Sequence, residues 1–86
     1  MRIQVLFFGG MREILACDQT TIESETDELR LSAVLDVLEQ RFPKLRAMQA
    51  NVRIALNEDF LVSSELDSST LHHGDVLAFI PPVSGG

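Results

Sequence analysis

Two adjacent prolines end the most apolar segment near the C-terminus and limit what the chain can form there. Residues 76–80 are β-branched, aromatic or otherwise apolar, which is typical of a strand buried in a sheet. Pro81 and Pro82 follow directly, and each fixes φ near −65° and lacks an N–H donor. The hydrogen-bond ladder of the strand therefore cannot continue through them. The sequence predicts a core strand that stops at Ile80 and a stiff segment that leaves the domain.

The last six residues, 81–86, are expected to form a protruding tail on a domain made of residues 1–80. At about 3.3 Å per residue they reach at most roughly 20 Å, enough to enter a deep pocket of another protein. Gly85 and Gly86 have no Cβ, so their backbone can approach catalytic groups closely. A loose terminus is the common alternative. The position of the glycines behind a rigid spacer and a core strand favours a functional tail.

Length and charge restrict the class of protein and the type of partner. A chain of 86 residues forms one domain, and no stretch has the length of a membrane span or the pattern of a signal peptide. We therefore expect a soluble cytoplasmic protein. Thirteen acidic residues against seven basic ones give a formal charge of −6, which argues against nucleic acid and favours a partner with a basic face.

The sequence offers no catalytic or metal-binding group of its own. Cys17 is the single cysteine, and no Cys/His spacing suits zinc. His72 and His73 are adjacent and point apart on a strand. Ser84 lacks a nearby base that would activate its hydroxyl. We expect no metal and no bound cofactor, and we expect the chain to be a substrate for the chemistry of other proteins.

The order of predicted elements indicates an α+β domain. Strands are expected at residues 3–8, 20–23, 52–56, 60–62 and 76–80. The main helix is expected from the apolar stripe Leu31, Val34, Leu35, Leu38 and Phe42, which Pro43 ends. Short helical turns are possible at residues 11–16 and 44–48, whereas residues 23–28 and 63–70 are expected to be polar connections. One helix then covers one face of a mixed sheet, with the first and last strands parallel at its centre.

The two ends of the chain carry a resemblance to a known family. The motif is Gly74-Asp75-Val76-Leu77-Ala78-Phe79-Ile80-Pro81-Pro82-Val83-Ser84-Gly85-Gly86, together with Val5-Leu6-Phe7-Phe8 and Arg12-Glu13. This pattern resembles the small subunits of molybdopterin synthase, a family of ubiquitin-like sulfur carriers, over essentially the whole chain. The resemblance implies the β-grasp fold of ubiquitin.

The resemblance also implies a reaction at Gly86. In such carriers a ubiquitin-activating-type adenylyltransferase uses ATP and Mg²⁺ to adenylate the terminal glycine, and a sulfur donor protein converts it to a thiocarboxylate. The large catalytic subunit then receives the tail, and the sulfur passes to cyclic pyranopterin monophosphate in molybdenum cofactor biosynthesis. The expected assembly is a heterotetramer of two small and two large subunits.

The residues that would contact partners follow from the same resemblance. They are Phe8, Arg12, Phe60, Ile80, Pro81, Pro82, Val83, Ser84 and Gly85. Because side chains alternate along a strand, only one of Phe7 and Phe8 can point inward. Phe8 is therefore either a core residue or part of a docking surface, and the sequence leaves both open.

Two other functions remain possible. Sulfur carriers for thiamin thiazole formation also end in Gly-Gly, but they are usually shorter and lack the Pro-Pro-Val-Ser spacer. A ubiquitin-like modifier or binding module would instead attach Gly86 to lysine, or form no bond at all. An intact-mass measurement after co-expression with an activating enzyme separates these readings.

Overall fold

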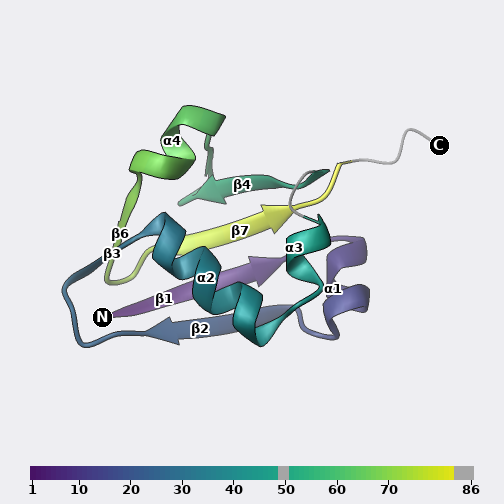
Figure 1. Ribbon diagram of the computed structural model, residues 1–86, viewed down its shortest axis with the longest axis horizontal. Helices are drawn as coiled ribbons and strands as arrows, with labels where there is room; N and C mark the ends of the chain where they lie inside the picture. The colour runs from purple at the N-terminus through teal and green to yellow at the C-terminus, as the bar shows by residue number, and fades with distance from the viewer. Residues whose placement is uncertain (49–50, 83–86) are drawn as a thin grey trace.

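The computed structural model describes residues 1–48 and 51–82, which form a mixed sheet with helices on one face (Figure 1). The strands are β1 (Arg2–Phe7), β2 (Gln19–Glu23), β3 (Glu28–Arg30), β4 (Arg53–Leu56), β5 (Asp59–Phe60), β6 (Thr70–His72) and β7 (Val76–Ile80). The helices are α1 (Gly10–Leu15), α2 (Leu31–Arg41), α3 (Leu45–Met48) and α4 (Ser63–Ser68).

The five-stranded sheet has the order β2-β1-β7-β4-β5, with the first and last strands of the chain at its centre. β1 and β7 pair in parallel, and Phe7 lies opposite Phe79. β2 pairs antiparallel with β1, β4 pairs antiparallel with β7, and β5 pairs antiparallel with β4 at the edge of the sheet. The predicted β-grasp arrangement and the central parallel pair are confirmed. The C-terminal end of β7 lies near α1 and α3, at the end of the molecule away from the N-terminus (Figure 1).

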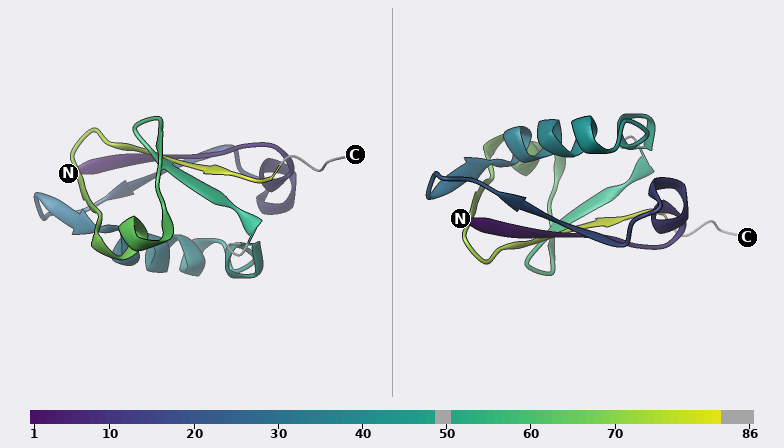
Figure 2. Two further views of the ribbon diagram at one scale, coloured as in Figure 1. Left: turned by 90° about the horizontal axis from the view of Figure 1, so that it is seen from above. Right: turned by 90° about the horizontal axis from the view of Figure 1, so that it is seen from below.

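Helix α2 covers only one face of this sheet (Figure 2). Leu31, Val34 and Leu38 are completely buried on the side of α2 that meets the sheet. The helix ends at Arg41, directly before Phe42 and Pro43, because the proline ring disfavours helical geometry in the preceding residue. Leu35, which was also expected in the apolar stripe, is only half-buried, so it is less buried than the stripe predicted.

Two predicted polar connections contain regular structure instead. Residues 63–70 hold α4 and the start of β6, so the prediction of a polar loop was wrong. The backbone N–H of Val62 donates to Glu65 Oε1 at 2.9 Å, which satisfies a free donor at the start of this helix, and half-buried Leu66 packs against the core. The sequence did not predict this helix because it has only 6 residues, and Leu66 is the one apolar residue among them.

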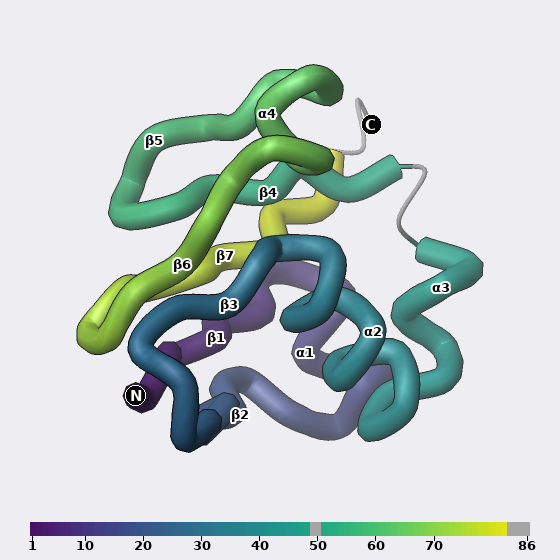
Figure 3. The backbone as a smooth tube through the Cα atoms, turned by 60° about the vertical axis from the view of Figure 1, so that its left-hand side comes forward, coloured from purple at the N-terminus to yellow at the C-terminus, as the bar shows by residue number. Residues whose placement is uncertain are grey.

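The stretch after Glu23 likewise ends in a strand that the sequence reading missed. β3 pairs with β6 in a separate two-stranded sheet, and Leu29 lies opposite the buried Leu71 (Figure 3). Three residues with one apolar side chain give too little alternation to distinguish a strand from a connection. This small sheet closes the end of the core that lies away from the C-terminus.

Both short helical turns are observed, as α1 and α3. The predicted strand 60–62 is shorter than expected, because only Asp59 and Phe60 pair with β4 and Val62 already precedes α4. Within residues 1–48 and 51–82, no helix has the length and hydropathy needed to cross a membrane.

Candidate functional site

The sheet face away from α2 carries an apolar groove. Its volume is about 440 Å³. The lining residues are Leu6, Phe8, Ala55, Asn57, Glu58, Phe60, Val76, Ala78 and Ile80. Most of them alternate with core residues along β1, β4 and β7, so the strands send apolar side chains to both faces. The groove therefore arises because, in this part of the sheet, the side chains that point away from α2 are apolar as well as those that point toward it.

Phe7 and Phe8 show how the two faces differ. Phe7 is 1% exposed and packs against Phe42 and Phe79, with ring centroids 5.3 Å and 5.6 Å away. Phe8 is 44% exposed and lines the groove. Its backbone N–H still donates to Phe79 O at 3.1 Å, which continues the pairing of β1 with β7 beyond the strand itself. The question left open by the sequence is thus settled in favour of a surface position for Phe8.

A tight hairpin turn presents Phe60 at the edge of the sheet. Asn57 and Glu58 have φ of 50° and 75°, the combination typical of a two-residue type I′ turn. The Asn57 side chain holds the turn against β7, because its Nδ2 donates to Asp75 Oδ1 at 3.0 Å and its Oδ1 accepts from the Val76 N–H at 2.9 Å. Phe60, 46% exposed, lies opposite Ala55 on the groove side.

A charged side chain lies on the ring of Phe60. The Cζ atom of Arg53 is 4.0 Å from the ring centroid, a cation–π contact. Arg53 is also the cross-strand partner of Ile80, the last residue of β7. It therefore lies at the end of the groove from which the tail departs.

The start of the tail is set against the turn after β1. Gly9 has φ of 58°, and a Cβ added there would come within 2.9 Å of Pro81 Cγ. A glycine at this point thus lets the chain bend while Pro81 lies close to it. Pro81 is half-buried and Pro82 is exposed, so the chain becomes solvated within these two residues.

Arg12 lies on α1, on the β1 side of the groove. Its side chain is exposed and lines a shallow hollow with Leu6, Phe8 and Asp18. Within the described part of the chain, no carboxylate forms a salt bridge with its guanidinium.

The structure brings together three of the side chains expected from the sequence, Phe8, Phe60 and Ile80, and places Arg12 and Pro81 next to them. Val83, Ser84, Gly85 and Gly86 lie outside the described residues, so the predicted role of the tail is untested. Sequence reasoning missed Arg53 and the small groove residues Ala55 and Ala78. Because side chains alternate along a strand, the two alanines could have been assigned to the face opposite Ile54 and Phe79, but no local pattern singles out Arg53.

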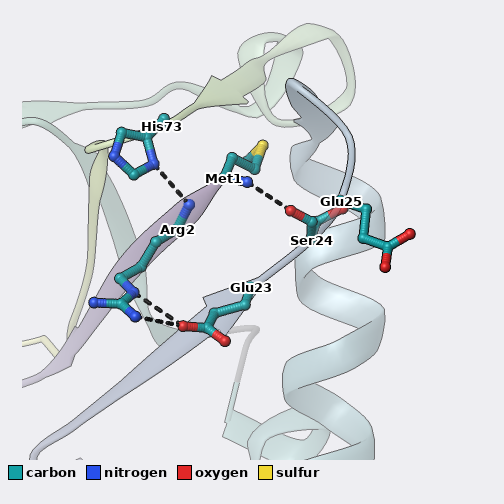
Figure 4. A pocket seen from close by; sticks show the side chains of 6 residues that line it. All are labelled: Met1, Arg2, Glu23, Ser24, Glu25 and His73. Carbon is teal, nitrogen blue, oxygen red and sulfur yellow. Dashed lines mark hydrogen bonds and ion pairs between the residues drawn. The ribbon is translucent and has the colours of Figure 1, made fainter.

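A second hollow, of about 640 Å³, lies around the start of β1 (Figure 4). Several of its polar groups bind one another. Arg2 Nη2 is 2.7 Å from Glu23 Oε1, and the Arg2 backbone N–H donates to His73 Nδ1 at 3.0 Å. This hollow is more polar than the groove and lies at the opposite end of the sheet from the tail. Among the residues that the structure describes, no group of three or more His, Cys, Asp or Glu side chains is placed to hold a metal ion.

The sequence profile of the ThiS family matches residues 5–86. The chain belongs to the ThiS family. The match begins in β1 and extends through the last glycine, so it includes both the groove strands and the tail.

Individual relatives of this ThiS-family chain are named as sulfur carriers. The molybdopterin synthase sulfur carrier subunit of Mycobacterium tuberculosis is 36% identical, with 100% of this chain and 99% of that protein covered. The protein of the same name from Arabidopsis thaliana is 35% identical, with 100% of this chain and 84% of that protein covered. The family and these relatives support a sulfur-carrier role.

Solved structures confirm the fold. The complex of subunits 1 and 2 of molybdopterin-converting factor from Helicobacter pylori contains a chain with a TM-score of 0.68 and 27% identity, and both chains are covered completely. SAMP1 from Haloferax volcanii has a TM-score of 0.83 at 19% identity, again with complete coverage of both chains. The second likeness shows the β-grasp fold and nothing further.

Proposed function

We propose that this protein is the sulfur carrier subunit of molybdopterin synthase. The strongest support is the full-length similarity to proteins of that name, at 36% and 35% identity. The geometry agrees with this role, because an apolar groove lies directly beside the strand that leads into the Gly-Gly tail. A carrier requires both features, since a partner must hold the domain while the tail reacts.

The proposed reaction begins at the α-carboxylate of Gly86. A C-terminal carboxyl group has a pKa of about 3.5, so it is ionised at neutral pH and is a poor acyl donor. A ubiquitin-activating-type adenylyltransferase, using ATP and Mg²⁺, would attach AMP to this carboxylate and release pyrophosphate. A sulfur donor protein would then supply sulfide, which displaces AMP and leaves the thiocarboxylate.

The second half of the reaction takes place on the large subunit. The thiocarboxylate sulfur would attack a carbon of cyclic pyranopterin monophosphate and displace oxygen there, and water would then cleave the thioester bond to Gly86. Each cycle would leave one sulfur on the pterin and restore the Gly86 carboxylate, so two carriers would supply the two sulfurs of the dithiolene. Gly85 and Gly86 keep the tail thin, because a side chain would widen the part that must enter two active sites. In this proposal the chain contributes no catalytic side chain of its own.

The groove and its neighbours would dock the carrier on its partners. Phe8, Phe60 and Ile80 form an apolar surface, and such exposed patches commonly mark protein interfaces. The Helicobacter pylori complex supports a large-subunit partner, because the chain similar to ours is there bound to subunit 2. We propose that two small and two large subunits assemble in the cytoplasm.

The alternative carriers and modifiers differ in what happens to Gly86. The ThiS-family match by itself also fits a carrier for thiamin thiazole formation. A carrier of either pathway gains a thiocarboxylate, whereas a modifier becomes attached to other proteins. Only the molybdopterin synthase subunit supports molybdopterin formation with the matching large subunit.

Reconstitution tests the proposal. The thiocarboxylated protein is mixed with the large subunit and cyclic pyranopterin monophosphate, and molybdopterin is measured. The wild-type protein should produce molybdopterin, and Gly85→Ala should be severely impaired because its Cβ obstructs the channel for the tail. A Ser32→Ala variant, changed at an exposed position of α2 on the other face of the sheet from the groove, is the control and should match wild type. No product from the wild-type protein contradicts the proposal.

A further inference from the structure

Arg53 is a charged residue at the tail end of a largely apolar groove. Its side chain is exposed and its guanidinium lies over Phe60, with Cζ 4.0 Å from the ring centroid. In the described part of the chain it forms no salt bridge, although the sequence contains thirteen acidic residues. The acidic residue of the same groove, Glu58, belongs to the turn at the other end of β4.

The position of Arg53 ties it to the tail. Arg53 lies opposite Ile80 in the β4–β7 register, and Pro81 is the next residue of the chain. In the sheet, β4 flanks β7 on one side and β1 flanks it on the other. Arg12, which follows β1, also has no carboxylate partner among the described residues. Two arginines therefore lie on either side of the strand that delivers the tail.

The contact with Phe60 prepares Arg53 for a directed contact with a partner. A guanidinium held over an aromatic ring has lost part of its freedom, while it still carries N–H donors. No hydrogen bond uses those donors within residues 1–48 and 51–82. A carboxylate can accept two of them at once in the bidentate arrangement that arginine favours.

A partner that docks on the groove would also cover the charge of Arg53. A partner that covers Phe60 and Ile80 must also remove water from around Arg53, which contacts one and lies opposite the other. Burying an unpaired charge is strongly unfavourable, so a stable complex needs an acceptor at this point, and a carboxylate is the best one because it also offsets the charge. The net charge of −6 favours basic partners in general. At physiological salt, however, interactions between exposed charges are screened beyond about 8 Å, so the charges close to Arg53 decide which group it contacts.

We propose that Arg53 binds a carboxylate of the large synthase subunit, at the rim of the channel that receives the tail. This rests on the proposed function. Arg53 is a positioning residue rather than a catalytic one. The tail of residues 81–86 can extend roughly 20 Å from it, so the chemistry occurs elsewhere. The contact would fix how the domain is oriented while the tail is inserted, and it would distinguish this partner from one without an acid at the rim.

The test compares three variants in binding to the isolated large subunit by surface plasmon resonance. Arg53→Met keeps an apolar stem but removes the charge, and it would leave the partner carboxylate unpaired. We expect binding at least about tenfold weaker, with faster dissociation. Arg53→Lys restores the charge without the fork and should recover part of the loss. Arg30→Met makes the same change of net charge on exposed β3, in the small sheet away from the tail, and should bind like wild type.

The outcomes separate this inference from the proposed function. Thermal unfolding first shows that each variant is folded. If wild type binds and Arg53→Met binds equally well or more tightly, Arg53 meets only apolar surface and the inference is wrong, whereas the proposed function stands. If Arg53→Met weakens only the complex with the activating enzyme, the inference is also wrong. If the wild-type carrier does not bind the large subunit at all, both fail together.

Discussion

The two faces of the central sheet are built from the same strands but have different roles. Toward α2, Val5, Phe7 and Phe79 are at most 1% exposed and form the core. The opposite face has no helix over it in the described structure (Figure 2), and Phe8 and Ile80, which line the groove there, are also apolar. Folding alone does not require large apolar groups on a solvated face, where alternation with polar residues is usual. The comparison indicates that the side chains facing α2 stabilise the fold, whereas the exposed apolar side chains on the other face are the ones that we propose as an interface.

The largest effect on stability is expected from a substitution among the buried side chains that face α2. Phe7→Ala removes a ring that packs between Phe42 and Phe79 and leaves a cavity in the core. The free energy of unfolding should fall by about 3–5 kcal/mol, a large share of the total for a small domain. Denaturant unfolding followed by circular dichroism measures it. A loss below about 1 kcal/mol would show that the two faces are not as different as their burial indicates.

The neighbouring residue should show the reverse behaviour. Phe8→Ala removes a half-exposed ring from the groove, so the free energy of unfolding should change by less than about 1 kcal/mol. Binding to the large subunit should nevertheless weaken by about 1–3 kcal/mol, because aromatic side chains contribute strongly at interfaces. Calorimetric titration with Phe8→Ala and wild type tests this. Unchanged binding would remove Phe8 from the docking surface.

A smaller effect is expected at the hairpin turn that borders the groove. Glu58 has φ of 75°, a conformation that disfavours residues with a Cβ and suits glycine. Glu58→Gly should therefore raise the free energy of unfolding by about 1 kcal/mol. A rise in Tm would show that Glu58, in the turn beside the groove, is less favourable for folding than glycine. A lower Tm would mean that the carboxylate stabilises the domain.

Much of the fold could be predicted because its long elements have strong patterns. The stripe from Leu31 to Leu38 predicted α2, and the apolar runs at both ends of the chain predicted the central parallel pair. Helix α4 and strand β3 could not be predicted in the same way. Each is short, and each depends on one half-buried leucine, Leu66 or Leu29, together with partners distant in sequence.

The candidate site was predicted only in part, for a related reason. Phe8, Phe60 and Ile80 were expected at a partner surface, and the structure brings them together. Arg53 could not be singled out, because an arginine in a short strand is ordinary until its register beside Ile80 and its stacking on Phe60 are known. Pairing between distant strands creates these contacts, and no local pattern contains that information.

The central claim is that this domain carries sulfur on its terminal glycine. The most direct measurement is the intact mass of the protein after incubation with the adenylyltransferase, ATP, Mg²⁺ and the sulfur donor, with a variant lacking Gly86 as control. We expect a mass increase equal to one exchange of oxygen for sulfur in the full-length protein, and none in the control. An unchanged mass, or transfer of the whole chain onto other proteins, would contradict it.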